Sequence, residues 1–144
     1  MKLPDVNILV YAHRLNAPEH AFYGPWLDKL VNGVSPFALS VIVASSFVRV
    51  MTQARLGGPP IELEQALGYI EVLSSAPTCR WVGVGSTNWN LVRDLCRATK
   101  TNGARLSDVQ RAAVAIEHGC TLVSRDRDFQ RFERHGLSFE LLEP

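Results

Sequence analysis

The sequence predicts an α/β protein in which a short parallel sheet is flanked by helices on both faces, as a three-layer sandwich. Short apolar runs alternate along the chain with longer amphipathic segments, which is typical of strands and helices that succeed one another in a parallel sheet. The chain has 144 residues, of which 47% are hydrophobic and 20% charged. This length and composition match one globular domain. We therefore expect a single domain over residues 1–144.

The expected elements follow the alternation in order. They are a very short strand that ends at Asp5, helices over residues 8–14 and 19–31, a strand over 37–40, helices over 41–55 and 62–73, a strand over 80–84, helices over 88–99 and 107–118, a strand over 121–124, a short helix over 126–134 and a strand over 138–142.

Turn residues and apolar spacing define these boundaries. Asn32 and Gly33 close the second helix, since this pair is favoured where a helix ends. The third helix is predicted by apolar residues that recur at helical spacing on one face. These residues are Val43, Phe47, Val50, Met51 and Ala54. The stretch from Leu56 to Pro60 is expected to be a loop. Ser107 and Gln110 form an S-x-x-Q capping box, which leaves Asp108 free at the first helical position.

Charge, hydropathy and cysteine content exclude several classes of protein. A formal net charge of +1 excludes a strongly basic, histone-like binder. No window approaches the ~18 consecutive apolar residues of a membrane span. Pro4 and Asp5 stand where a signal peptide would be apolar, so a cytoplasmic location is expected. Cys79, Cys96 and Cys120 have no C-x-x-C spacing and are interpreted as buried thiols.

Acidic residues recur where a strand gives way to a helix or where a helix begins. These residues are Asp5, Asp108 and Asp126, with Asp128 close behind. Each alone is explained as a helix cap, because aspartate is favoured there. Together they indicate more, since the carboxyl ends of parallel strands share one edge of the sheet. Carboxylates gathered there repel one another unless a cation lies between them.

A divalent cation is the natural partner of such a cluster. Mg²⁺ prefers oxygen ligands and is held by one or two carboxylates together with water and phosphate oxygens. A site of this kind hydrolyses phosphodiesters with a metal-bound water, so that no side-chain nucleophile is needed. The sequence has no G-x-S-x-G, P-loop or G-x-G-x-x-G motif that would indicate another chemistry.

Four segments in this order resemble the PIN-domain ribonuclease toxins of VapBC toxin–antitoxin systems. The segments are D-V-N-I-L-V-Y-A from Asp5, L-S-x-x-V-x-S-x-F-V-R-V-x-T from Leu39, S-D-V-Q-R-A-A-V-A-I-E-H-G from Ser107 and T-L-V-S-R-D-R-D-F from Thr121. The resemblance covers almost the whole chain. It implies a PIN-like fold and an Mg²⁺- or Mn²⁺-dependent endoribonuclease that a cognate VapB-like antitoxin silences.

The resemblance also assigns site residues. Asp5, Asp108 and Asp126 match the metal-binding acids of the family, and Asp128 matches a further acid in the same D-x-D-F signature. Asn7 and Ser124 match polar residues that flank the site.

Two positions depart from the family pattern. Family members usually carry a Glu on the helix after the second strand, where this chain has Val41 or Ser46, depending on the alignment. Ser46 is the better candidate, because it lies off the apolar stripe, and its hydroxyl can at most hold a metal-bound water. Pro4 lies in the expected central strand, where it removes a ladder donor. We expect a local irregularity there.

Basic and apolar surface residues indicate binding partners. Residues 93–134 hold nine Lys and Arg against six Asp and Glu, which suits a polyanion such as RNA. Arg93, Arg97 and Lys100 are expected on one helical face, as RNA contacts or as a solvated surface. The three tryptophans, Trp26, Trp81 and Trp89, are expected to pack in the core or at an interface. Two apolar helix faces are candidates for a homodimer or antitoxin interface, or for ordinary core, and their residues are Phe22, Trp26 and Leu30, and Leu63, Leu67 and Ile70.

Two other functions remain open on the sequence. A haloacid-dehalogenase-like phosphatase also begins with an Asp after its first strand, but it needs a second Asp where this chain has Asn7, which cannot donate a proton as a carboxylic acid does. A PIN fold that has lost catalysis and only binds RNA or an antitoxin would explain the missing Glu. The four retained acids argue against it.

Overall fold

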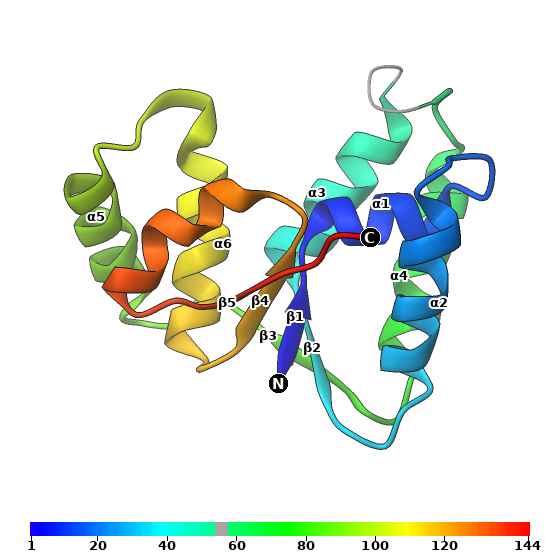
Figure 1. The fold of residues 1–144 in the computed structure, drawn as a ribbon, viewed down its shortest axis with the longest axis horizontal. Coiled ribbons are helices and arrows are strands. Elements are labelled where there is room, and N and C mark those ends of the chain that lie inside the picture. The colour runs from blue at the N-terminus through cyan, green and yellow to red at the C-terminus, as the bar shows by residue number, and fades with distance from the viewer. Residues whose placement is uncertain (54–57) are drawn as a thin grey trace.

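A computed structural model describes residues 1–53 and 58–144. In this part of the chain a five-stranded sheet lies between two layers of helices (Figure 1). All neighbouring strands are parallel, in the order β3-β2-β1-β4-β5. The strands are β1 (Lys2–Pro4), β2 (Phe37–Ser40), β3 (Cys79–Val82), β4 (Thr121–Ser124) and β5 (Ser138–Leu141). The predicted α/β three-layer sandwich is confirmed.

The helices divide between the two faces of the sheet (Figure 1). One layer contains α1 (Val6–His13), α2 (His20–Val31), α3 (Val41–Thr52) and α4 (Leu63–Ser74), and the other contains α5 (Asn88–Thr99), the 3₁₀ turn η1 (Gly103–Arg105), α6 (Leu106–Glu117) and the 3₁₀ helix η2 (Arg127–His135). Each layer buries its own apolar cluster against the sheet.

Strand β2 shows how one short segment serves both clusters. Phe37 and Leu39 pack in the cluster under α1 to α4, whereas Ala38 packs in the cluster under α5, α6 and η2. Successive side chains of a strand point to opposite faces, so a strand of four apolar or small residues is buried on both sides. This explains why the strands read as short apolar runs rather than as alternating patterns.

The apolar stripe predicted for the third helix is buried as expected. Val43, Phe47, Val50 and Met51 of α3 all belong to the first cluster. The helix ends at Thr52, and Gln53 is extended, so α3 is shorter than the expected 41–55. Residues 54–57, which include the last part of that expected helix and the first part of the expected loop at 56–60, lie outside the described residues.

Pro4 produces the irregularity expected in the central strand. The amide of Asp5 donates to the carbonyl of Val123 in β4 at 2.8 Å. Because successive amides of a strand point to opposite neighbours, the nitrogen of Pro4 faces β2 and has no proton to donate. Strand β1 accordingly pairs through three residues with β4 but through only Lys2 with β2.

Three local expectations are wrong. The capping box does not form, because η1 runs directly into α6, and Ser107 Oγ donates to the Ala104 carbonyl at 3.2 Å. Asp108 is therefore the third residue of α6 rather than its first. The interpretation of all three cysteines as buried holds only for Cys120. The short helix expected over 126–134 does form, as a 3₁₀ helix over Arg127–His135.

Among the residues that the structure describes, no helix combines the length and the apolar character needed to cross a bilayer.

Candidate functional site

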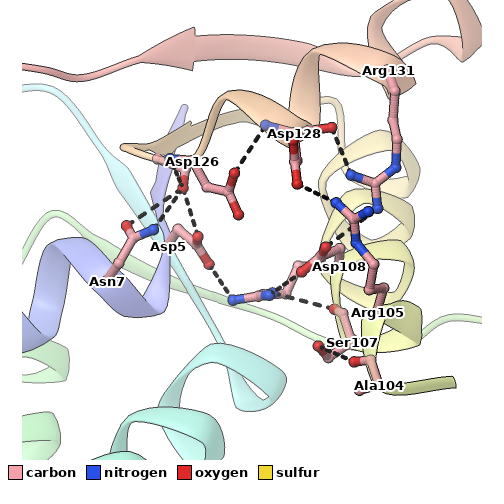
Figure 2. Close-up of polar contacts among 11 residues, drawn as sticks. Asp5, Asn7, Ala104, Arg105, Ser107, Asp108, Asp126, Asp128 and Arg131 are labelled. Carbon is pink, nitrogen blue, oxygen red and sulfur yellow. Dashed lines mark hydrogen bonds and ion pairs between the residues drawn. The ribbon is translucent and has the colours of Figure 1, made fainter. Parts of the chain in front are cut away.

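The four predicted acids gather at the carboxyl edge of the sheet (Figure 2). Asp5 follows β1 and Asp126 follows β4, and these two strands are neighbours. The chain continues from β1 to β2 and β3 on one side, whereas β4 and β5 lie on the other. Such a switch in strand order opens a crevice at the carboxyl edge, where ligands bind in parallel α/β sheets. Asp108 reaches this crevice from the first turn of α6.

Asp5 is almost completely buried, with 1% of its surface exposed. It precedes α1, but its side chain makes no capping hydrogen bond. Its Oδ2 instead accepts a hydrogen bond from Ser124 Oγ at 2.7 Å, and its Oδ1 accepts one from Arg111 Nη1 at 2.8 Å. The capping explanation is therefore wrong for Asp5.

The capping explanation does apply to Asp126. Its Oδ1 accepts a hydrogen bond from the amide of Asp128 at 2.9 Å, which starts η2. This hydrogen bond also turns the segment after β4, so that Asp126 and Asp128 both face the crevice (Figure 2).

Ser124 links Asp5 with Asp126. Its fully buried hydroxyl donates to Asp5 and accepts hydrogen bonds from Asn7 Nδ2 at 3.0 Å and from the amide of Asp126 at 3.1 Å. Asn7 Oδ1 in turn accepts from the amide of Arg125 at 3.5 Å. Asn7 and Ser124, which the resemblance placed beside the site, thus orient the Asp5 carboxylate.

Three arginines neutralise the acids. Arg111 bridges Asp5 and Asp108, because its Nη2 lies 2.5 Å from Asp108 Oδ1 while its Nη1 holds Asp5. Arg131 Nη2 lies 3.3 Å from Asp108 Oδ2, and Arg105 pairs with Asp128. No motif in the sequence assigned these arginines to the site. Only the spacing of Asp108 and Arg111, three residues apart on one helix, could have indicated one of these pairs.

The four acids offer the donor atoms that a divalent cation prefers, but their carboxylates are not spaced to bind one in this structure. All four offer carboxylate oxygens, which hard cations prefer. Within residues 1–53 and 58–144, however, no three acidic, histidine or cysteine side chains converge closely enough to hold an ion. The guanidinium of Arg111 supplies positive charge between Asp5 and Asp108. It thus stands in for a cation at the position where these two carboxylates require one.

A cavity of about 210 Å³ adjoins the acids between α1, α3 and α6. Its lining includes Asn7 and Arg111, which contact the acid network, and Ser46 and Arg49 of α3. Val41 does not line this cavity and is 60% exposed. Of the two positions considered for the missing Glu, Ser46 is therefore the one that faces the site.

The basic residues expected to bind RNA lie away from the acids. Arg93 and Arg97 are one helical turn apart on α5, and Arg93 Nε donates to Asp94 at 3.0 Å. Lys100 follows the end of α5 in a left-handed conformation, with φ of 52°, so it does not continue their helical face. None of the described polar contacts joins these three residues to the four acids.

The tryptophans and the apolar faces differ from one another in burial. Trp26 packs against the first cluster together with Phe22 and Leu30, as ordinary core. Trp81 and Trp89 are exposed, so a position in the core is wrong for both. On α4, Ile70 is buried, but Leu63 and Leu67 remain exposed.

The comparisons with known proteins agree with this geometry. The family model described as PIN domain matches residues 2–135. The chain is similar to Ribonuclease VapC25 of Mycobacterium tuberculosis, with 36% identity over 132 residues that cover 92% of this chain and 93% of that protein. It is also similar to Ribonuclease VapC43 of the same species, with 37% identity over 130 residues that cover 90% of this chain and 88% of that protein.

Solved structures show the same fold. A chain of the VapBC2 structure from Rickettsia felis, bound to a promoter DNA fragment, has a TM-score of 0.69 at 20% identity, with 96% of each chain covered. Mycobacterium tuberculosis VapC20, described as a toxin that cleaves the sarcin-ricin loop, has a TM-score of 0.68 at 14% identity, with both chains fully covered. From the matched family model and these sequence relatives, the chain belongs to the PIN-domain family and, within it, to the VapC group.

Proposed function

We propose that this protein is a metal-dependent endoribonuclease and the toxin of a type II toxin–antitoxin pair, acting in the cytoplasm as one PIN domain. The observation that carries the proposal is the position of the Asp5 carboxylate. It is buried at the switch point of the sheet, is oriented by Ser124, and lies beside Asp108. The curated names of the sequence relatives support ribonuclease activity.

In this proposal Asp5, Asp108 and Asp126, with Asp128, hold Mg²⁺ or Mn²⁺. When bound, the ion supplies a water of lowered pKa and neutralises charge on the attacked phosphodiester. The chain's own part is to fix the acids. Ser124 and Asn7 hold Asp5 in one orientation, and the hydrogen bond from Asp128 to Asp126 holds the second carboxylate. Fixing the carboxylates in this way lowers the conformational cost of bringing them onto an ion.

RNA binding rests on the cavity and on the arginines around it. Arg49 and Arg111 line the cavity beside the acids, together with apolar side chains of α1 and α3. Positive charge next to a carboxylate cluster suits a substrate that carries phosphates and approaches an acidic centre. Arg93, Arg97 and Lys100 would add contacts farther along the RNA. Such distant contacts contribute to affinity rather than to the reaction.

The test is cleavage of RNA by the purified protein with Mg²⁺ or Mn²⁺. We expect cleavage to stop when the ion is chelated, and Asp5→Asn to lower the rate by at least 100-fold, since this change removes a charged ligand at an unchanged shape. Asp94→Asn is the matched control, because Asp94 is exposed on α5 and, among the described residues, its one ion pair is with the neighbouring Arg93. It should cleave at the wild-type rate.

Two outcomes would contradict the proposal. Wild-type cleavage by a folded Asp5→Asn protein would exclude the metal site. RNA binding without cleavage, in wild type and Asp5→Asn alike, would favour the alternative that this fold only binds RNA or an antitoxin, which the replacement of the usual Glu by Ser46 supports. Hydrolysis of a generic phosphomonoester instead of RNA would indicate a phosphatase.

We further propose a VapB-like antitoxin as partner, and a homodimer. Both rest on the family and on the exposed Leu63 and Leu67 of α4, since apolar side chains exposed on one helix mark an interface. The solved relatives include VapBC complexes.

A further inference from the structure

Arg111 is held between the acids by a dense set of contacts. Beyond its two ion pairs with Asp5 and Asp108, its Nε donates to the Ser107 carbonyl at 3.2 Å. Its guanidinium lies over the Phe129 ring, 5.4 Å from the centroid. Only 15% of its side chain is exposed. Because all three guanidinium nitrogens donate to protein oxygens and the guanidinium lies over Phe129, Arg111 belongs to a built arrangement rather than to a mobile surface.

The charges explain why Arg111 lies there. Asp5 and Asp108 are both buried, and each has an oxygen within 3 Å of the same guanidinium. Buried like charges are costly unless a cation offsets them. Without another cation, Arg111 therefore stabilises the acid cluster.

We infer that Arg111 is a built-in competitor of the divalent cation, so that metal binding and the Arg111 bridge exclude each other. The inference rests on the proposed function for the presence of a metal. A guanidinium and a divalent cation cannot both bind the same two carboxylates. The two positive charges repel each other, and both would contact the same carboxylate oxygens. Arg111 also lines the adjoining cavity, which gives a displaced side chain room beside the acids. It is thus a positioning residue that sets the cation affinity of the free protein.

The first test measures Mn²⁺ binding by calorimetry without RNA. Arg111→Met keeps a long side chain that packs on Phe129 but removes the charge. We expect it to bind Mn²⁺ at least 10-fold more tightly than wild type, because no ion pair has to be broken. The metal-free variant should melt at a lower temperature, and saturating Mn²⁺ should raise its Tm by more than it raises that of the wild type. Arg134→Met is the matched control, because Arg134 is exposed near the end of η2, and it should change neither quantity.

A second measurement uses the wild-type protein, in case Arg111→Met does not fold. The ¹⁵N-labelled Nε–H of Arg111, assigned by the loss of its signal in Arg111→Lys, donates to the Ser107 carbonyl, so its signal reports whether the guanidinium keeps its place between the acids. We expect saturating Mg²⁺ to shift this signal and to speed its exchange with water. A signal that stays unchanged while the amide of Asp126 shifts would overturn the inference, because metal would then bind beside an intact bridge.

The outcomes separate this inference from the proposed function. If wild type binds Mn²⁺, Asp5→Asn does not, and Arg111→Met binds with the wild-type affinity or more weakly, the inference alone is wrong. If neither wild type nor Arg111→Met binds Mn²⁺ or Mg²⁺, both the metal dependence and the competition are wrong.

Discussion

At the scale of single residues, the hydroxyl of Ser124 is a small group whose removal we expect to have a large effect on metal binding and RNA cleavage. It donates its one proton to Asp5 and accepts from Asn7 and from the amide of Asp126. Removing it leaves two partly buried donors without this acceptor and lets the Asp5 carboxylate rotate. Groups that orient metal ligands in this way typically contribute about 10–100-fold to metal affinity or activity.

We therefore predict that Ser124→Ala lowers both RNA cleavage and Mn²⁺ affinity by about 10–100-fold while KM for RNA stays unchanged. Cleavage assays and calorimetry measure the two effects. Ser138→Ala is the control, because the one hydrogen bond of Ser138 Oγ within residues 1–53 and 58–144 is with Thr121 Oγ1, on an exposed part of β5. A Ser124→Ala protein with normal Mn²⁺ affinity would show that Ser124 does not position Asp5.

The sequence predicted the acids of the site but not their partners. Asp5 and Asp126 were predictable because each follows a strand, and parallel strands bring such positions to one edge. The bridge from Arg111 to Asp5 was not, because it joins residues 106 positions apart. It depends on how α6 docks beside β1. The i,i+3 pair of Arg111 with Asp108 was visible, but such a pair usually indicates only local helix stabilisation.

At the scale of elements, the carboxylate of Glu117 fastens the connection between β3 and α5 to the end of α6. It accepts hydrogen bonds from the Gly85 amide at 3.0 Å, the Thr87 hydroxyl at 3.0 Å and the Asn88 amide group at 3.1 Å. The hydrogen bond from the Gly85 backbone is the main cause that lowers the pKa of Glu117. All three donors favour the ionised carboxylate.

This lowered pKa gives a pH prediction. Because the carboxyl group has a lower pKa in the folded protein, its contribution to stability is fully present above the usual Glu value of 4.5 and is lost as the pH falls through the folded pKa. We expect the amide signal of Gly85, followed by NMR, to titrate with a midpoint below 4.5. In Glu117→Gln this titration should vanish. A midpoint at or above the usual value would contradict the hydrogen-bonded arrangement.

All of the expected helices and strands form, but most of their ends differ from the expected residues by one to three positions. Strands β2 and β4 and helix α5 coincide with their expected ranges, since apolar runs and amphipathic spacing define them. The start of α6 was wrong by one residue, because the turn η1 continues into it and withdraws Ser107 from the capping position. The sequence did not show how many residues of β1 pair with each neighbouring strand around Pro4, because this depends on the order of the strands in the sheet.

At the scale of the whole molecule, the sheet lies between two helical layers (Figure 1), and the four acids lie at its carboxyl edge (Figure 2). A partner that inhibits the proposed reaction must cover this edge. A short segment that carries an arginine would suit it, because a guanidinium already bridges the acids from within the chain.

We predict that co-expression with the neighbouring reading frame restores growth and yields a complex that co-purifies with this protein. Purification on a tagged partner and size-exclusion chromatography measure it. Asp94→Asn, which leaves the edge unchanged, should behave as wild type in the same experiment. Failure of the neighbouring product both to bind and to restore growth would exclude it as the antitoxin.

The two chain ends lie at opposite edges of the sheet. Residue 1 precedes β1 at the amino edge of the sheet, whereas the Leu142 amide donates to the carbonyl of Ser124 at 2.8 Å, beside the acids (Figure 1). The Leu142 carbonyl also accepts from the Tyr23 hydroxyl at 3.0 Å, which ties the end of the chain to α2. An affinity tag or fluorophore attached before residue 1 therefore leaves the crevice accessible, while one attached after residue 144 stands at its entrance.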